Sequence, residues 1–245
     1  MAHQRDWDVM DDLPTEWVRA IEVSFLGRLP ERTWRPLFDR AHQIEAPPRT
    51  VLYAETEQVR TAHLVLVLDG LVRVYRTSRS GREVALRYAR RGDILGLPSV
   101  VAQASPAAAQ AVIPTRAVAM SAQTLRSRAQ RDGQLAWAMA EEMAGSLFNI
   151  QERLAHNVFA PVRSRVARYL LDVGGPAGAD YVAAASYEDI AGAIGTVREV
   201  VARTLATLRD EGLVRRTDTG ILLVDLEGLR QAAQADEFRD FRSRP

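Results

Sequence analysis

The sequence predicts an α+β protein with an antiparallel β domain first, one long helix after it, and a winged helix-turn-helix near the C-terminal end. Three observations lead to this prediction. Short apolar segments separated by turn residues fill the first half of the chain, as is typical of antiparallel sandwiches and barrels. A narrow apolar stripe with helical spacing follows them. The last quarter holds two short helical segments and then a two-strand hairpin.

The composition allows two ordinary globular domains and gives no sign of a membrane protein. The 245 residues, 47% of them hydrophobic, are enough for two buried cores. No apolar run approaches the ~20 residues of a membrane-spanning helix. Residues 1–12 also lack the basic start and apolar stretch of a secretory signal. We therefore expect a cytoplasmic protein with no membrane partner.

Several kinds of catalytic and metal site are excluded by what the sequence lacks. There is no cysteine, which excludes disulfides, cysteine-ligated zinc and iron–sulfur clusters. The four histidines show no ligand spacing, and the chain has neither a nucleophile–base constellation nor a glycine-rich phosphate loop. We therefore expect no metal site and no enzyme. All 32 basic residues are arginine, but the net charge is only +1, so the whole chain is not a general binder of nucleic acid.

Helical signals open the chain before the strands begin. Trp17, Ile21 and Phe25 lie four residues apart and predict one helix that ends at Gly27. A second short helix is expected to begin near Pro30, and the proline pair Pro47-Pro48 is expected to end the helical lead. Strands are then expected over 63–70, 71–75, 83–88 and 112–120, with turns at 69–70, 80–81 and 91–96.

A narrow apolar stripe marks the long helix. Its members are spaced like the a and d positions of a coiled coil, and charged residues flank them. Such a stripe packs either on the β domain of its own chain or on a second copy of the helix, and its narrowness favours the second copy. We therefore expect a homodimer. Its expected interface residues are Ala136, Ala140, Met143, Leu147, Ile150 and Leu154.

The long helix separates two predicted domains. Residues 1–132 are assigned to the β domain, 133–158 to the helix and 159–245 to the C-terminal domain. This division is chosen because Pro161 marks a hinge and suits the start of a new helix. The glycine-rich segment 174–178 is expected to be a loop.

The stretch 186–210 has the pattern of a helix-turn-helix. Ser186 and Asp189 predict a capping box, with which a helix begins. Gly195 suits the left-handed position in a tight turn between two helices. The second helix is expected from about Thr196 to Asp210. The apolar residues that it should bury are Val197, Val201, Leu205 and Leu208.

This burial would leave Arg198, Glu199 and Arg203 exposed in the N-terminal half of the second helix. A recognition helix presents that half to base edges in the major groove of DNA. Arginine can donate twice to guanine, and glutamate can accept from cytosine, although it would only repel a phosphate. The same charges also occur on the solvated face of an ordinary helix. Together with the turn before them, they favour double-stranded DNA as a partner.

A hairpin over 212–224 follows the two helices, as in winged helix-turn-helix domains. Arg215 and Arg216 on this hairpin are expected to lie near phosphates. Ser186 and Thr196, at the starts of the two helices, are expected to add phosphate contacts. Such contacts fix the register of a protein on DNA without reading its sequence.

The order of these motifs resembles that of the cyclic-AMP receptor protein (CRP/FNR) family of bacterial regulators, from about Phe25 to Ala233. The segments Leu66–Tyr75 and Gly92-Asp-Ile-Leu-Gly96 resemble turns of the family's β-roll. A further resemblance is to the family's recognition helix and the turn before it. It is carried by the segment Gly195-Thr-Val-Arg-Glu-Val-Val-Ala-Arg-Thr-Leu-Ala-Thr-Leu208. The resemblance implies a cyclic-nucleotide-binding-like β-roll (a jelly roll), a dimerisation helix, and a winged helix-turn-helix.

The resemblance also implies a function. Arg198 and Arg203 would each read a guanine, and Glu199 a cytosine, in half-sites like TGTGA of a palindromic site. The protein would be a DNA-binding transcription regulator that acts as a homodimer. RNA polymerase is then a candidate partner, for which the stretch 174–185 is a candidate contact.

Three departures from the family pattern concern the effector. Members that bind cyclic AMP have a glutamate after the glycine that matches Gly96, an arginine followed by a small hydroxyl residue, and a threonine on the long helix. Here the corresponding positions hold Leu97, the stretch Ser105-Pro-Ala-Ala-Ala109, and Ile150. A buried phosphate without a paired cation is strongly disfavoured. We therefore do not expect cyclic AMP to be the effector.

The pocket that the resemblance implies would instead be apolar. It could hold an uncharged or apolar small molecule, including haem with His63 or His42 as its ligand. It could equally be filled by its own side chains and sense nothing, and an unknown or absent effector is favoured over haem. The expected pocket residues are Leu97, Ala107, Ala108, Ala109, Leu147 and Ile150.

Overall fold

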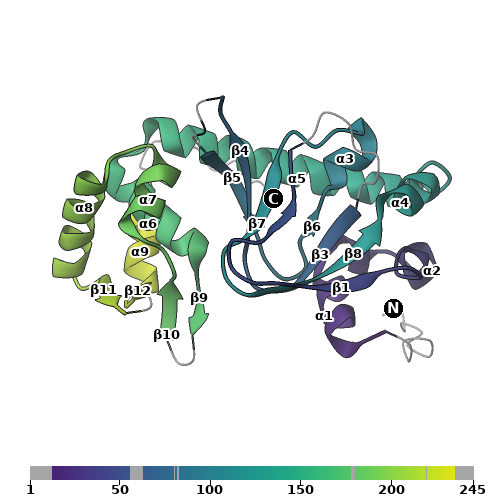
Figure 1. Ribbon diagram of the computed structural model, residues 1–245, viewed down its shortest axis with the longest axis horizontal. Helices are drawn as coiled ribbons and strands as arrows, with labels where there is room; N and C mark the ends of the chain where they lie inside the picture. The colour runs from purple at the N-terminus through teal and green to yellow at the C-terminus, as the bar shows by residue number, and fades with distance from the viewer. Residues whose placement is uncertain are drawn as a thin grey trace, which may run out of the picture. The chain divides into compact units, whose positions relative to one another are not determined.

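The computed structural model describes residues 13–55, 63–79, 81, 83–177, 180–218 and 220–234. The N-terminal tail, the turn residue Ser80 and the loop residue Gly178, which enter the predictions above, lie outside this part. The helical elements are α1 (Thr15–Val23), η2 (Phe25–Arg28), α2 (Glu31–Trp34), η3 (Arg35–Leu37), α3 (Leu97–Ala102), α4 (Ala122–Ala129), α5 (Gly133–Phe159), α6 (Val162–Val173), α7 (Tyr187–Ile194), α8 (Arg198–Asp210) and α9 (Leu226–Ala233) (Figure 1). The strands are β1 (His42–Ala46), β2 (Val51–Tyr53), β3 (His63–Asp69), β4 (Val72–Thr77), β5 (Glu83–Ala89), β6 (Ile94–Leu95), β7 (Ala108–Ala111), β8 (Thr115–Ser121), β9 (Gly174–Ala177), β10 (Asp180–Ala183), β11 (Val214–Thr217) and β12 (Gly220–Leu223).

The described residues divide into two compact units. The first holds those up to Arg76 together with 87–148, and the second holds 77–86 together with those from Asn149 onward. Helix α5 is one continuous helix of 27 residues that begins in the first unit and ends in the second. Within the described ranges, no helix combines the length and the hydropathy that crossing a membrane would require.

The first unit contains two antiparallel sheets, in agreement with the predicted fold class. One has the strand order β1-β8-β3-β6 and the other β2-β7-β4-β5. Strand β3 alternates between two cores, because successive side chains of a strand point to opposite faces. Leu64, Leu66 and Leu68 pack with α1 and α5, whereas Val65 and Val67 pack between the sheets. The buried residues between the sheets, the inter-sheet cluster, are Val65, Val67, Val72, Val74, Ala89, Leu95, Ala109 and Ala117.

The helical lead is shorter and less regular than predicted. Helix α1 ends at Val23, because Ser24 takes an extended backbone and its hydroxyl accepts a hydrogen bond from the backbone N–H of Leu26. That bond starts the 3-10 turn η2, which carries Phe25 into the same core as α1. The proline pair at Pro47 does not end a helix, since β1 precedes it and pairs with β8.

Most of the predicted strands are confirmed, with small shifts at their ends. The segments 63–70, 71–75 and 83–88 correspond to β3, β4 and β5, and the segment 112–120 corresponds to β8. Strands β1, β2, β6 and β7 are absent from the prediction. The last two hold only two and four residues, and β7 consists of alanine and glutamine, which have little preference for strands.

The second unit packs helices against a small sheet with the order β11-β12-β10-β9. The loop predicted over 174–178 is wrong, because residues 174–177 form β9, which pairs with β10. Glycine is needed at the start of this strand for space rather than for a turn. A Cβ at Gly174 would lie 2.8 Å from the carbonyl oxygen of Leu170 on α6.

Candidate nucleic-acid interface

Helix α7 begins at the predicted capping box. The hydroxyl of Ser186 accepts a hydrogen bond from the backbone N–H of Asp189 at 3.1 Å, and the Asp189 carboxylate accepts one from the backbone N–H of Ser186 at 2.9 Å. The Ser186 hydroxyl also donates to that carboxylate at 2.7 Å. These bonds fix the start of the helix. The side chain that is expected to reach a phosphate is therefore engaged in the cap.

The turn between α7 and α8 has the predicted left-handed glycine. Gly195 has φ 68° and ψ 46°, and the backbone N–H of Thr196 donates to the carbonyl oxygen of Ala191 at 2.9 Å. This arrangement ends a helix by giving partners to its last carbonyl groups. Thr196 itself is half-buried in the turn.

We expect Gly195→Ala to lower the free energy of unfolding by about 1–2 kcal/mol, because a Cβ on a left-handed residue crowds the following carbonyl. A Cβ there would meet nothing else within 4 Å. Gly192, inside α7, is the matched control, because a Cβ there also meets nothing within 4 Å. Gly192→Ala should stabilise by about 0.5–1 kcal/mol. Urea unfolding measures both changes, and a stabilising Gly195→Ala would contradict the role given to the turn.

Helix α8 buries one side and exposes the other. The prediction that Val197 is buried is wrong, because it precedes the helix as its N-cap residue and 58% of its surface is exposed. The turn after Gly195 is longer than predicted, so the helix begins only at Arg198. The side chains that it buries are Val201, Leu205 and Leu208, as predicted.

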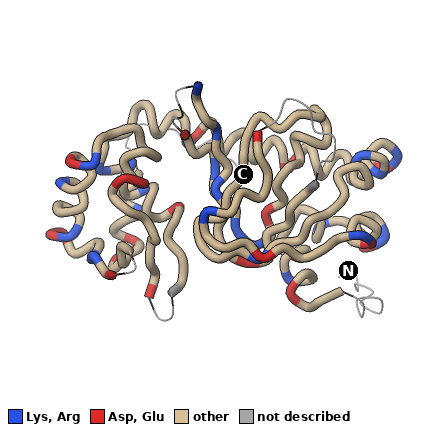
Figure 2. Tube along the Cα trace, in the orientation of Figure 1, with Lys and Arg blue, Asp and Glu red and all other residues tan. Residues whose placement is uncertain are grey.

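The three predicted base readers are exposed on α8. They are Arg198, Glu199 and Arg203, and Figure 2 shows both basic and acidic residues along this helix. The Nε of Arg198 lies 2.8 Å from a carboxylate oxygen of Glu188 on α7. Arg203 has no side-chain partner among the described residues. The sequence does not predict that Glu188 pairs with Arg198, because an acidic residue is common in the first turn of any helix.

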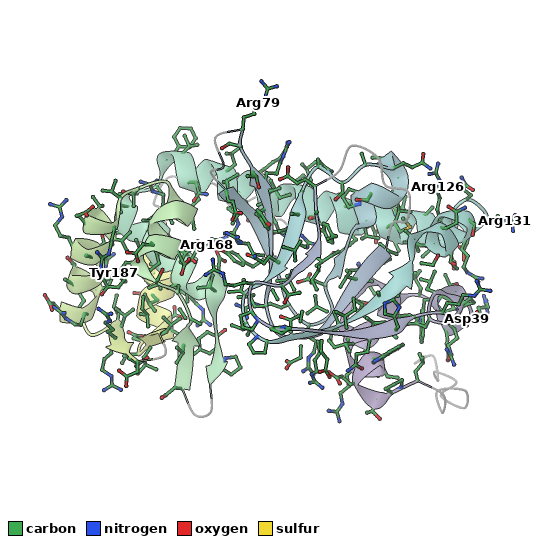
Figure 3. All side chains as sticks on the ribbon, viewed as in Figure 1. Asp39, Arg79, Arg126, Arg131, Arg168 and Tyr187 are labelled. Atoms are coloured by element: carbon green, nitrogen blue, oxygen red, sulfur yellow. The ribbon has the colours of Figure 1, made fainter. Side chains whose placement is uncertain are left out.

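The hairpin of β11 and β12 is the predicted wing, with its strands paired over 214–217 and 220–223. Arg215 and Arg216 are exposed on it. The guanidinium carbon of Arg216 lies 5.4 Å from the ring centre of Tyr187, the first residue of α7, which is labelled in Figure 3. This cation–π contact holds the wing arginine against the helix-turn-helix.

A hollow of about 430 Å³ lies where the start of α7, the start of α8 and the wing meet. Ser186, Arg198 and Arg216 line it, so the fold brings three of the predicted contact residues together. Glu188 and Asp218 line it as well, which leaves the hollow mixed in charge. The arginines of the hollow are thus placed to contact an anion. Its carboxylates reduce the non-specific electrostatic attraction of the hollow for anions.

Helix α5 has one face in the core and an apolar face outside it. Met143, predicted for the dimer seam, packs against the core that contains the leucines of β3. Ala136 and Ala140 are exposed, Leu147 and Leu154 are 52% and 63% exposed, and Ile150 is half-buried. The exposed stripe therefore keeps Ala140, Leu147 and Leu154 of the predicted one but leaves out Met143. Its members, each three or four residues from the next, are Trp137, Ala140, Ala144, Leu147, Gln151, Leu154 and Val158.

The residues predicted for an effector pocket do not share one environment. Leu97 is buried with the helices of the first unit, whereas Ala109 belongs to the inter-sheet cluster and Ala107 packs at its margin. Ala108 is buried on the other face of β7, and Leu147 is more than half exposed. The histidines considered for haem lie in the other sheet: His42 on β1 is exposed, and His63 begins β3, its side chain lying outside the described part.

Two domain families match this chain. Residues 43–132 match the cyclic nucleotide-binding domain, and residues 164–232 match the Crp-like helix-turn-helix domain. The first match covers strands from both sheets, and the second covers α7, α8 and the wing.

Curated relatives agree with these matches. The transcriptional regulator LdrP of Thermus thermophilus is 34% identical over 191 residues, which cover 76% of this chain and 93% of that protein. A CRP-like cAMP-activated global transcriptional regulator of Mycobacterium tuberculosis is 26% identical over 88% of this chain and 95% of its own length.

Solved structures give the same result. A CRP-family transcriptional regulator of Thermus thermophilus has a TM-score of 0.64 at 27% identity, over 78% of this chain and 96% of that one. FixK2 of Bradyrhizobium japonicum has a TM-score of 0.67 at 25% identity, over 80% and 98% of the two chains.

Proposed function

Because this chain belongs to the CRP/FNR family of transcriptional regulators, we propose that it binds a two-fold symmetric DNA site as a homodimer and reads each half-site with α8. It is a regulator with a DNA-binding helix-turn-helix domain, and its relatives are not enzymes. The observation that carries the proposal is the placement of Arg198, Glu199 and Arg203. All three are exposed on α8, whose opposite side is buried.

The chemistry of these side chains suits base edges. Each guanidinium donates two hydrogen bonds to the O6 and N7 of a guanine, and the carboxylate accepts from the N4 of a cytosine. The half-sites then resemble TGTGA. Arg215 and Arg216 on the wing contact phosphates, which set the register without selecting a sequence. Because a bacterial regulator must reach chromosomal DNA, we expect the protein to act in the cytoplasm.

The dimer uses the exposed stripe of α5. An apolar stripe with coiled-coil spacing on a helix surface buries itself against a second copy of the helix. Small residues at Ala140 and Ala144 let the two helices approach closely. Two-fold symmetry then places the two α8 helices in successive major grooves, about 34 Å apart.

Cyclic AMP does not control this regulator in our proposal. The positions at which cyclic-AMP-binding members carry a carboxylate and an arginine are here Leu97 and the alanine stretch 107–109. Leu97 is 3% exposed within an apolar core, and Ala109 is fully buried in the inter-sheet cluster. Neither offers a partner to the ribose or the cyclic phosphate.

Selection of bound fragments from a pool of random DNA tests the proposal. We expect enrichment of an inverted repeat with half-site centres about 10 base pairs apart, with or without cyclic AMP. The two arms of the repeat should each contain the guanines and the cytosine that α8 reads. Enrichment of a single half-site would contradict the dimer, and a sequence that changes with cyclic AMP would contradict its independence of that nucleotide.

A further inference from the structure

The guanidinium of Arg198 has one side-chain partner within the described part of the chain, and this partner lies on the other helix of the helix-turn-helix. The Nε of Arg198, the first residue of α8, lies 2.8 Å from a carboxylate oxygen of Glu188, the second residue of α7. Both residues line the hollow where the two helix starts meet the wing. The fold thus brings the two charges together from different helices.

The other carboxylates near these helix starts do not pair with Arg198. The carboxylate of Asp189 accepts hydrogen bonds from Ser186 in the cap of α7. Glu199 follows Arg198 directly in the sequence, yet the two form no ion pair in the described structure, and neither does Asp218 with Arg198. Glu188 is therefore the acid that holds Arg198, and Glu199 is left free to accept from a base.

The ion pair contributes little to the stability of the free protein. Each of its side chains is 64% exposed, and pairs in water are weak because the solvent screens them. Contact with DNA would exclude water from the hollow and lower the local dielectric constant, which strengthens the attraction between the two charges. The pair is thus suited to act in the complex with DNA.

We propose that Glu188 is a positioning residue that holds Arg198 toward one guanine and away from the phosphates. This inference rests on the proposed function, in which Arg198 reads a base. A contact at Nε leaves the four N–H groups of the two Nη atoms, and the O6 and N7 of a guanine need two of them. The carboxylate also restricts a long side chain before DNA arrives, so that less conformational entropy is lost on binding.

Without Glu188, the guanidinium of Arg198 would be drawn to the phosphates, which attract it whatever the base sequence. Arg203 gives an internal comparison, because it is exposed on the same helix and has no side-chain partner among the described residues. A change at Glu188 should therefore alter the base preference at the pair that Arg198 reads and leave the preference at the pair that Arg203 reads.

Competition between the selected DNA site and its single-base variants tests the proposal. Arg198→Ala first identifies the base pair concerned, at which the preference for guanine should be lost. Glu188→Ala should lower the preference at that pair by about three- to tenfold, because the side chain is no longer held. It should also raise the affinity for random DNA by about twofold or more, because a negative charge near the phosphates is removed. Glu188→Gln keeps an oxygen that accepts from Nε and should restore part of the preference.

Asp218→Ala is the matched control, because it removes a carboxylate from the same hollow but not from Arg198. It should raise the affinity for random DNA as Glu188→Ala does and leave every base preference as in the wild type. When Glu188→Ala is combined with Arg198→Ala, the base preferences should equal those of Arg198→Ala alone.

An unchanged preference in Glu188→Ala at the pair that Arg198 reads would overturn the proposal. An equal loss at the pair that Arg203 reads would also overturn it, since the whole helix would then be disturbed, as would the same relaxation in Asp218→Ala. Failure of the proposed function gives a different result. Arg198→Ala would then lower binding to all sequences by one factor, and the role given to Glu188 would be wrong with it.

Discussion

Leu147→Asp should convert the protein into monomers and weaken its binding to a two-fold symmetric site by roughly 10²–10⁴-fold. Two copies of the stripe on α5 would bring the two aspartates close together in an apolar seam, where an unpaired charge costs several kcal/mol. A monomer then contacts one half-site at a time, and it loses the gain that joining two binding modules provides. Sedimentation measures the mass, and fluorescence anisotropy of labelled DNA measures the affinity.

A control on the same helix separates charge from position. Asn149 is exposed on α5 but lies outside the stripe, so Asn149→Asp adds the same charge away from the proposed seam. It should leave both mass and affinity near those of the wild type. A dimeric Leu147→Asp with normal DNA binding would place the interface elsewhere on the molecule.

Arg203→Ala should weaken binding to the selected site by about 1–3 kcal/mol for each half-site and relax the choice at one base pair. The side chain is exposed on the reading side of α8, and no described group competes for its guanidinium. Removing it leaves the O6 and N7 of one guanine without donors, whereas other bases at that position lose nothing. Competition with sites that carry each single base change measures the effect.

Arg209 provides the comparison for this variant. It lies in the last turn of α8, exposed, and its guanidinium bonds to the Asp210 carboxylate. Arg209→Ala should change binding to all sequences equally and only slightly. If Arg203→Ala also lowered binding to random and selected DNA by the same factor, Arg203 would be a phosphate contact and not a reader.

The helix-turn-helix could be predicted closely because its signals are local. A capping box involves residues three apart, and a left-handed glycine is set by its own backbone. Ser186, Asp189 and Gly195 therefore appear in the structure as predicted. The burial of Val197 could not be predicted in this way, because it depends on the residue at which α8 begins. Sequence patterns place the end of a helix only to within a residue or two, and such a shift moves Val197 from the helix into the turn before it.

The elements that the sequence does not reveal are those that depend on distant partners. Strand β7 is a run of small residues, and it is a strand only because β2 and β4 pair with its two edges. Strand β9 is a glycine-rich segment that β10 holds in place. The orientation of α5 is set in the same way, since Met143 is drawn into the core under the leucines of β3. Tertiary packing thus overrides local preference at all three places.

The two helices of the helix-turn-helix, α7 and α8, differ in how they start. A reciprocal cap closes the start of α7, but the residue before α8 is Val197, whose side chain can accept no hydrogen bond. The leading amide groups of α8 therefore lack the side-chain acceptor that an N-terminal turn needs. Water is left to hydrate them while the protein is free of DNA. An oxygen of the DNA backbone that arrives there would take the place of the missing cap, so contact with DNA would stiffen the same turn that carries Arg198 and Glu199.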